Sequence, residues 1–371
     1  MTNQPLIAID ALALGQRTKG ATRVLANLVG CLPAADPSLR YAAIVPAGTE
    51  GAARVRERAP QMDVIEVEAG GGLSWELRGV ARAAEGADLL FTIRELVPMS
   101  GPPTLMHVFE PPSYRLHARD RLDAAEAKRL AKDAVLAIAF RNSVRRAAAV
   151  TAGSRSTAAW LLRRTGRTAD VVLPGVDPIF FTDHAQPVDE PPYVLHPASG
   201  DPRENTELVL RAFATGRPQG LRLVLVGTPA SRQDDLRRRA ERLGVEVELP
   251  GWVTDERLRE LYRGARAVVA PSKFESYAGL QVLEGMALGT PAIALDAPGV
   301  TEALEGRAIL IGREDFNELA DALVRIRDDE ALRVHLAARG RELAHGLTWE
   351  RAAAGFAAAF RKVLERGRES R

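Results

Sequence analysis

Short apolar runs that favour β-strands alternate with longer stretches that favour helices, and this alternation most constrains how the chain can fold. In the first half of the sequence the predicted strands are residues 6–9, 41–45, 64–67, 89–93 and 104–108, and the predicted helices include residues 24–32 and 75–85. Strands that are repeatedly followed by helices indicate a parallel sheet with helices on both faces.

The same pattern begins again after residues 181–192, a stretch rich in Pro and Asp whose composition is typical of a linker. The second series comprises predicted strands at 193–196, 221–226, 245–249, 267–270, 292–295 and 308–311, and predicted helices at 205–214, 231–243, 255–263 and 280–288. We therefore predict an α/β protein with two Rossmann-like doubly wound domains facing a cleft, residues 1–180 and 193–347. Residues 348–371 are predicted to form an amphipathic helix that packs back across the domains.

Composition and charge exclude several classes of protein. The 371 residues suffice to bury a large core without disulfides. A net charge of +2 gives no electrostatic reason to expect a nucleic acid partner. The single cysteine, Cys31, cannot form an internal disulfide, which favours a reducing cytoplasm. We expect neither an export signal nor a membrane span, because no apolar run approaches the ~20 residues that a span needs.

Arg and Lys residues are concentrated in the segment 115–146, on predicted helices. One interpretation is a surface that contacts anionic lipid, as in peripheral contact with the inner face of a membrane, or an acidic acceptor. The other is a solvated helix face with internal salt bridges. Interleaved Asp and Glu residues favour the second interpretation.

Residues 267–295 carry the most informative pattern, a strand, a loop, a helix that ends near Gly289, and a further strand. In parallel α/β sheets, ligands bind beyond the carboxyl ends of strands, and a helix N-terminus offers N–H groups to an anion. We therefore predict a phosphate site, where Gly279 allows close backbone approach. Glu284 is placed to accept hydrogen bonds from the vicinal hydroxyls of a ribose. Alternatively, Glu275 and Glu284 are ordinary acidic residues of a loop and a helix.

The segment PSKFESYAGLQVLEGMALGTPAIA resembles the donor-site signature of retaining glycosyltransferases of the GT-B fold, the group 1 or family 4-like glycosyl transferases. Other segments resemble this family in the same order along the chain: residues 20–32, MHVFEP at 106–111, 145–156, LPGVDP at 173–178, 196–214 and 250–272. The resemblance covers nearly the whole chain.

The resemblance implies a metal-independent enzyme that moves a sugar, with retention of configuration, from a nucleotide diphosphate sugar to a glycan, lipid-linked or small-molecule acceptor. Such enzymes act in glycoconjugate, polysaccharide or natural-product assembly. It implies catalytic roles for His107 and Glu275, although a lone histidine can also be structural. The implied donor-binding residues are Ser199, Arg203, Gly251, Val253, Lys273, Ser276, Tyr277, Ala278, Gly279, Leu280 and Glu284, and the implied acceptor-side residues are Gly20 and Arg23.

No Asp-x-Asp sequence occurs in the chain, so we expect no bound metal and no cofactor. Protein groups must then stabilise the leaving diphosphate. The positions at which the family has a diphosphate-binding Arg and Lys are occupied by Ser199 and Glu204. Two lost charge-assisted contacts cost roughly 3–6 kcal/mol, and Arg203 and Lys273 are the cations we place nearby.

A second departure from the family lies in the donor loop. The spacing from Glu275 to Glu284 is one residue longer than in the family, so Ser276 stands where the first Glu is expected. The two departures together favour an alternative, a glycosyltransferase-like protein without transferase activity that serves as a binding or partner subunit. A third interpretation is another enzyme class on the same architecture, such as a sugar-nucleotide epimerase or a phosphorylase.

Overall fold

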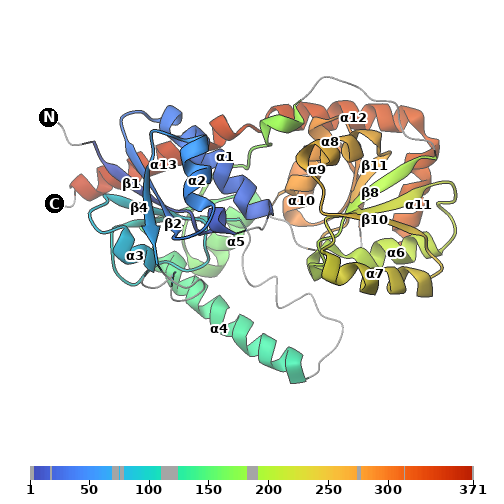
Figure 1. Cartoon of the computed structure of the whole chain (residues 1–371), viewed down its shortest axis with the longest axis horizontal. Helices are drawn as coiled ribbons and strands as arrows, with labels where there is room; N and C mark the ends of the chain where they lie inside the picture. Colours follow the sequence, from blue (N-terminus) through green and yellow to red (C-terminus); the bar gives the residue numbers. More distant parts are fainter. Residues whose placement is uncertain are drawn as a thin grey trace. The chain divides into compact units, whose positions relative to one another are not determined.

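The structure, a computed structural model, describes residues 4–16, 19–68, 75, 79–109, 124–181, 191–273, 277–312 and 314–369. The chain forms two compact units (Figure 1). Unit 1 comprises Met1–Gly175 and Leu347–Arg371, and unit 2 comprises Val176–Gly346. Each unit contains one parallel sheet with helices packed against it, which confirms the predicted class of two Rossmann-like doubly wound domains.

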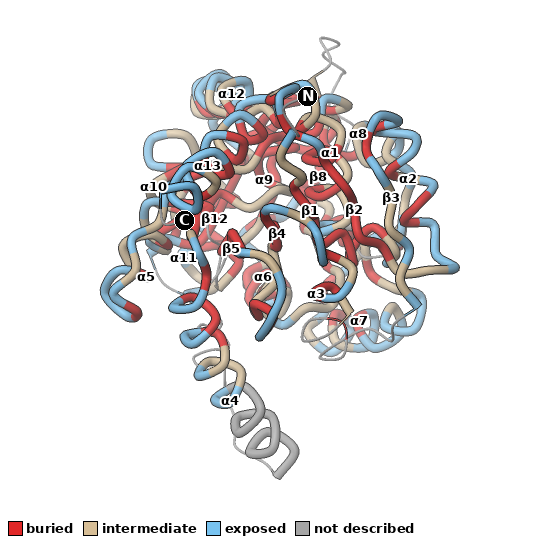
Figure 2. The backbone as a smooth tube through the Cα atoms, turned by 90° about the vertical axis from the view of Figure 1, so that its left-hand side faces the viewer, coloured by how far each residue is buried: buried red, intermediate tan, exposed pale blue. Residues whose placement is uncertain are grey.

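The sheet of unit 1 has seven parallel strands in the order β3-β2-β1-β4-β5-β6-β7. Their bounds are β1 Leu6–Asp10, β2 Arg40–Pro46, β3 Asp63–Val67, β4 Leu89–Thr92, β5 Thr104–Val108, β6 Ala149–Ala152 and β7 Asp170–Val171. The central strands are mostly apolar, as expected for a parallel sheet that helices cover on both faces. Ile7 and Ile9 of β1, for example, are fully buried. Figure 2 shows buried positions along the strands and mixed exposure along the helices.

The helices of unit 1 are η1 Leu12–Gly15, α1 Lys19–Ala35, α2 Gly51–Arg58, α3 Val80–Ala83, α4 Ala124–Arg146, α5 Arg155–Thr165 and α13 Trp349–Glu369. α5 begins at an N-cap, because the Ser154 hydroxyl accepts a hydrogen bond from the backbone N–H of Thr157 at 3.0 Å. Of the helix predicted at 75–85, the structure describes Trp75 and residues 79–85, and α3 is shorter than expected. Residues 76–78 lie outside the described part.

α13 packs on unit 1 through aromatic contacts and an ion pair. The rings of Phe356 and Phe360 lie 5.0 and 5.4 Å from the ring of Phe91 on β4. Arg361 donates to the buried carboxylate of Asp36, which follows α1, at 2.5 Å. This hydrogen-bonded pair lowers the pKa of Asp36 to about 2. The last described helix of the chain is therefore a structural part of unit 1.

The sheet of unit 2 has six parallel strands in the order β10-β9-β8-β11-β12-β13. Their bounds are β8 Tyr193–Pro197, β9 Arg222–Val226, β10 Val247–Gly251, β11 Ala267–Ala270, β12 Ala292–Leu295 and β13 Ile309–Ile311. The helices are η4 Pro178–Phe180, η5 Pro202–Glu204, α6 Thr206–Ala214, α7 Ala230–Arg242, α8 Asp255–Gly264, α9 Leu280–Ala287, α10 Pro298–Leu304, α11 Phe316–Asp328 and α12 Glu330–His345. Fully buried Val194, Val269 and Ile293 form part of its core.

No helix in the described ranges is long and apolar enough to cross a membrane.

Candidate functional site

The strand order of unit 2 defines where a ligand can bind. β8 lies between β9 and β11, and the chain returns from β10 across the sheet to β11, so this is the point at which the direction of winding reverses. Two contacts join the loops that follow β8 and β11. The Lys273 N–H donates to the Arg203 carbonyl at 2.9 Å, and the Asn205 side chain donates to the Pro271 carbonyl at 3.4 Å. The structure thus brings Arg203 and Lys273 together at one edge of the sheet.

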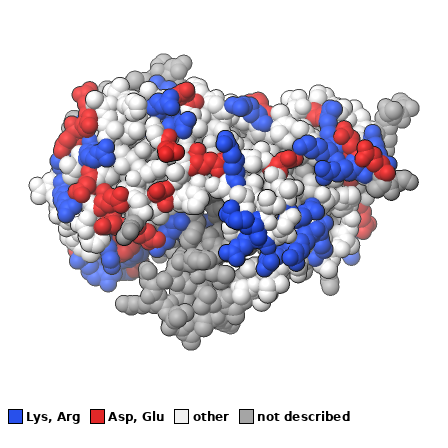
Figure 3. All heavy atoms as spheres, turned by 180° about the vertical axis from the view of Figure 1, so that it is seen from behind, with Lys and Arg blue, Asp and Glu red and all other residues white. Residues whose placement is uncertain are grey.

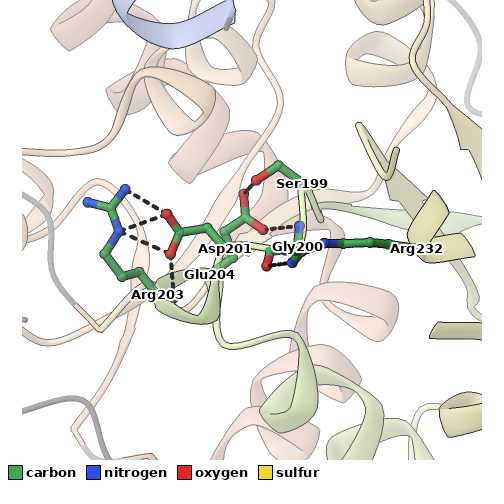
Figure 4. Close-up of polar contacts among 6 residues, drawn as sticks. All are labelled: Ser199, Gly200, Asp201, Arg203, Glu204 and Arg232. Atoms are coloured by element: carbon green, nitrogen blue, oxygen red, sulfur yellow. Dashed lines mark hydrogen bonds and ion pairs between the residues drawn. The ribbon is translucent and has the colours of Figure 1, made fainter. Parts of the chain in front are cut away.

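The loop after β8 binds a carboxylate of the chain itself (Figure 4). The Ser199 hydroxyl donates to Glu204 Oε1 at 2.6 Å, and the Gly200 N–H donates to Glu204 Oε2 at 3.1 Å. Burial raises the pKa of Glu204, and its hydrogen bonds with Ser199 and Gly200 only partly offset that effect. Ser199 and Glu204, the two residues that depart from the family pattern, are therefore hydrogen-bonded to each other.

Three cationic side chains of the described residues contact the chain around this edge, two from the loops after β8 and β11 and one from α7. The Arg203 guanidinium binds Asp201, with a shortest distance of 2.8 Å. Lys273 Nζ lies 2.8 Å from Glu314. Arg232, near the start of α7, donates to the Gly200 carbonyl (Figure 4).

Sequence reasoning missed Arg232. The signal that places it is the strand order, because α7 follows β9, and β9 lies next to β8, so the first turn of α7 falls at the same edge of the sheet.

The start of α9 carries several residues of the predicted donor site. Gly279 precedes the helix with φ 81°, a conformation that favours glycine. Glu284 is 6% exposed and accepts a hydrogen bond from the Tyr262 hydroxyl at 3.0 Å. Tyr262 lies on α8, and its carbonyl accepts from Thr290 Oγ1 at 2.7 Å, which ties α8 to the end of α9. Sequence reasoning missed Tyr262 because nothing in the spacing links the two helices.

The remaining residues predicted around α9 are only partly described. Tyr277 and Ala278 are buried immediately before the helix, and Leu280 is its first residue. Glu275 and Ser276 lie outside the described residues. Which of these two residues takes the place of the first Glu of the family signature is therefore not shown by the described residues.

The end of β10 contributes a third loop to the same edge. Gly251, the last residue of β10, has φ 70°, and its carbonyl accepts from the Gly227 N–H at 2.8 Å. Trp252 follows with 48% of its surface exposed, and Val253 is half-buried. An exposed indole offers a surface on which a planar base can stack. Sequence reasoning named the neighbours of Trp252 and omitted the indole itself.

His107 lies on β5 of unit 1 and is 2% exposed. Its Nδ1 lies 2.9 Å from Thr151 Oγ1, and its ring packs edge-on against Phe109 and Phe356, with centroids 4.4 and 4.9 Å away. Burial lowers the pKa of His107 to about 3, so the imidazole is neutral at neutral pH. The described contacts hold this ring in the core of unit 1, and its contact with a sugar stays a prediction.

The other predicted acceptor-side residues lie in the first turns of α1, where Gly20 is exposed and Arg23 is half-buried. The end of the MHVFEP segment, residues 110 and 111, lies outside the described part of the chain.

Sequence reasoning missed Asp10, which ends β1 at the point where unit 1 reverses its winding. Its carboxylate is buried and accepts hydrogen bonds from Trp75 Nε1 at 2.9 Å and Thr92 Oγ1 at 3.1 Å. Burial raises the pKa of Asp10. The signal in the sequence that could have identified Asp10 is its place at the end of the apolar run LIAID.

Across the described side chains, no group of three or more His, Cys, Asp or Glu residues is arranged to hold a metal ion.

In comparison with known families, residues 191–329 match the model of the glycosyl transferases group 1 family. The D-inositol 3-phosphate glycosyltransferase of Rhodococcus erythropolis is 30% identical over 206 residues, which are 54% of this chain and 45% of that protein. The O-antigen chain mannosyltransferase B of Escherichia coli is 29% identical over 164 residues, 43% of this chain and 42% of that protein. The matched region thus spans less than half the length of these curated relatives.

Solved structures resemble the chain over almost its full length. Sucrose-phosphate synthase from Thermosynechococcus elongatus superposes with a TM-score of 0.75 at 22% identity and covers 98% of this chain and 100% of its own. Anabaena HepE in complex with UDP-glucose superposes with a TM-score of 0.72 at 17% identity and covers 97% of this chain and 100% of its own. At these identities the likeness establishes the fold.

Proposed function

Because this chain has the GT-B fold and its residues 191–329 form a group 1 glycosyl transferases domain, we propose that it is a glycosyltransferase that uses a nucleotide diphosphate sugar. The observation that carries this proposal is the meeting of the β8 and β11 loops at the reversal point of unit 2, inside the matched domain. HepE, whose fold is similar, binds UDP-glucose, and this supports the class of donor.

We assign the donor to the edge of the unit 2 sheet. The base lies by Gly251 and Val253, where the exposed Trp252 offers a stacking surface. The ribose hydroxyls donate to Glu284, whose carboxylate Tyr262 orients. The diphosphate contacts a set of side chains and backbone groups, namely Ser199, Arg203, Lys273 and the N–H groups of residues 277–280. The resemblance to the family assigns Glu275 or Ser276 to the donor sugar, and both residues lie outside the described part of the chain.

We propose front-face substitution with retention of configuration. The acceptor oxygen attacks the anomeric carbon on the face from which the diphosphate leaves. The bond from that carbon to the phosphate oxygen breaks, and the leaving oxygen takes the acceptor's proton. Charge builds up on the diphosphate, so fixed donors and cations around it are the main source of catalysis. No metal is required in this scheme.

On the acceptor side, His107 acts as a neutral hydrogen-bonding group, because its low pKa excludes a cation at neutral pH. The resemblance to the family implies that it orients a hydroxyl of the sugar during transfer. Gly20 and Arg23, at the start of α1, contact the acceptor.

Part of unit 1 has the composition of a surface that contacts anionic lipid. Val135 and Ile138 of α4 are 66% and 63% exposed, and Arg141 and Arg145 are exposed on the same face of this helix. Figure 3 shows one face of the molecule with a group of lysine and arginine side chains and few acidic side chains among them. We propose that α4 brings the enzyme to the inner face of a membrane that holds a lipid-linked acceptor.

The proposed donor is tested by thermal unfolding of the purified protein with a panel of nucleoside diphosphates and their sugars. A ligand at 100 times its Kd adds about 2.7 kcal/mol of stability. A shift with one base identifies the donor, and transfer of its sugar to acceptor extracts then tests catalysis. No shift with any nucleotide at millimolar concentration contradicts the proposal and favours a binding or partner subunit without transferase activity.

A further inference from the structure

The loop after β8 presents two neutral donors, the Ser199 hydroxyl and the Gly200 N–H, and both are used by one carboxylate. Glu204 places one oxygen on each of them, at 2.6 and 3.1 Å (Figure 4). These donors lie directly after the last residues of β8, at the point where the winding of unit 2 reverses. They are groups that a phosphate of the donor would contact. The chain therefore supplies its own anion at this position.

Charged groups face Glu204 from several elements. On η5, Asp201 raises the pKa of Glu204 further, and Arg203 is bonded to Asp201. From α7, Arg232 donates to the Gly200 carbonyl, and from the β11 loop, Lys273 pairs with Glu314. In the described part of the chain, the hydrogen bonds that Glu204 accepts come from Ser199 and Gly200, both neutral. The negative charge of a buried carboxylate is poorly stabilised when its hydrogen bonds come only from neutral donors. Such a carboxylate repels a second anion strongly.

We propose that Glu204 limits the affinity of the donor site for phosphate groups, because its carboxylate occupies the donors of the β8 loop and competes there with the phosphates of the donor. This inference rests on the proposed function. For the diphosphate to bind, Glu204 must either take up a proton or leave Ser199 and Gly200. The residue thus weakens the binding of every ligand whose phosphate occupies this position, so a donor depends on its contacts to base, ribose and sugar for tight binding.

The competition predicts a dependence of donor affinity on pH. A protonated Glu204 carries no charge and does not repel phosphate, so the wild type binds a nucleotide sugar more tightly at low pH. Affinity falls as the pH rises through the pKa of Glu204, which lies above the ordinary value for a glutamate. Nucleotide sugars suit the test because they lack the terminal phosphate that titrates near pH 6 in a nucleoside diphosphate.

The test compares the wild type with Glu204→Gln, which keeps the shape of the side chain and removes its charge. Calorimetric titration with UDP-glucose, GDP-mannose and inorganic pyrophosphate is carried out between pH 5.5 and 8. We expect the variant to bind the nucleotide sugar and pyrophosphate about tenfold to a hundredfold more tightly than the wild type does at pH 8. For the nucleotide sugar, whose phosphates do not titrate in this range, we expect the affinity of the variant to depend little on pH. Glu207→Gln is the matched control, because Glu207 also lies near the start of α6 and pairs with Arg211 and Arg239.

The outcomes separate this inference from the proposed function. Equal affinity and equal pH dependence in wild type and variant overturn the role of Glu204 and leave the donor site intact. Tighter binding of pyrophosphate without binding of any nucleotide supports the role of Glu204 and contradicts the proposed donor. An equal gain in Glu207→Gln also overturns the inference, because it shows a general charge effect. If Glu204→Gln does not fold, as judged by its thermal unfolding, Glu204→Ala takes its place. This variant should also bind the nucleotide sugar and pyrophosphate more tightly than the wild type.

Discussion

At the scale of single residues, the motif determined which side chains to examine, and the structure determined what each one contacts. Glu284 could be placed on a helix from the sequence, because its position relative to Gly279 and Gly289 fixes it about one turn after the start. Its partner Tyr262 could not be predicted, because that contact depends on how α8 packs on α9. Arg232 reaches Gly200 only because β9 lies beside β8. Residue type and spacing therefore identify the candidate side chains, and strand order determines which groups lie beside them.

Trp252 gives a direct test of the base-binding edge. Replacement of Trp252 by Ala is expected to weaken nucleotide binding by about 1–3 kcal/mol, the usual value of stacking between a base and an aromatic ring. Fluorescence or calorimetric titration with the nucleotide found by thermal unfolding measures this change. Trp252→Phe serves as the control that keeps an aromatic ring. Unchanged affinity in Trp252→Ala would place the base elsewhere.

Two buried histidines predict how stability depends on pH. Burial lowers the pKa of His107 to about 3 and that of His196 to about 4, whereas a histidine in an unfolded chain titrates near 6.5. The unfolded state therefore binds more protons below about pH 6.5, so the stabilisation is present above that pH and is lost as the pH falls toward 4. Each histidine contributes a slope of up to about 1.4 kcal/mol per pH unit.

Denaturant unfolding between pH 7.5 and 4.5 measures this slope. His196→Gln is expected to show a shallower fall in stability than the wild type. His335, which is exposed on α12, provides the control His335→Gln. A slope that stays the same in His196→Gln would contradict the assigned cause.

At the scale of elements, strands with several consecutive apolar residues were predictable to within one or two residues, and β5, β11 and β12 match their predicted bounds. Elements that are short, or that consist of small residues, could not be predicted in this way. β6 reads Ala-Val-Thr-Ala and β7 has only two residues, so neither carries a local signal that separates it from a loop. The helices α10, α11 and α12 also went unpredicted, although β13, which separates α10 from α11, was predicted at 308–311.

The contact of α13 with unit 1 predicts a large effect of a substitution far along the chain. Phe360 is fully buried against Phe91, so Phe360→Ala is expected to lower the free energy of unfolding of unit 1 by about 3–5 kcal/mol. Denaturant unfolding measures the loss, and Phe360→Leu should recover most of it. A loss below about 1 kcal/mol for Phe360→Ala would show that α13 contributes little to this unit.

The exposed face of α4 predicts binding to anionic vesicles. The purified protein should sediment with vesicles that contain phosphatidylglycerol and not with vesicles of phosphatidylcholine alone. Replacing Val135 and Ile138 by Ser should weaken this binding about tenfold or more, because each aliphatic side chain gains roughly 1.5 kcal/mol on burial. Val334→Ser, at a 64% exposed position of α12, is the matched control. Equal sedimentation of the double variant and the wild type would refute a lipid contact through α4.

At the scale of the whole molecule, the doubling of the α/β pattern was sufficient to predict two Rossmann-like domains, because each series of strands and helices can form its own doubly wound sheet.

The proposed mechanism makes a prediction for the intact enzyme. Once a donor and an acceptor are known, NMR of the product should show the anomeric configuration of the donor sugar, and excess chelator should leave the rate unchanged. An inverted product would exclude front-face substitution, and loss of activity with chelator would show that a metal takes part.

The return of α13 to unit 1 has a consequence for biosynthesis. Residues 347–371 leave the ribosome after all of unit 2, so unit 2 can fold during translation while unit 1 still lacks a helix. Until then, Phe91 and His107 lack the Phe356 and Phe360 rings that cover them in the finished protein. The first domain to be synthesised is thus the last to be completed. The nascent chain then exposes an apolar surface of the kind that chaperones bind.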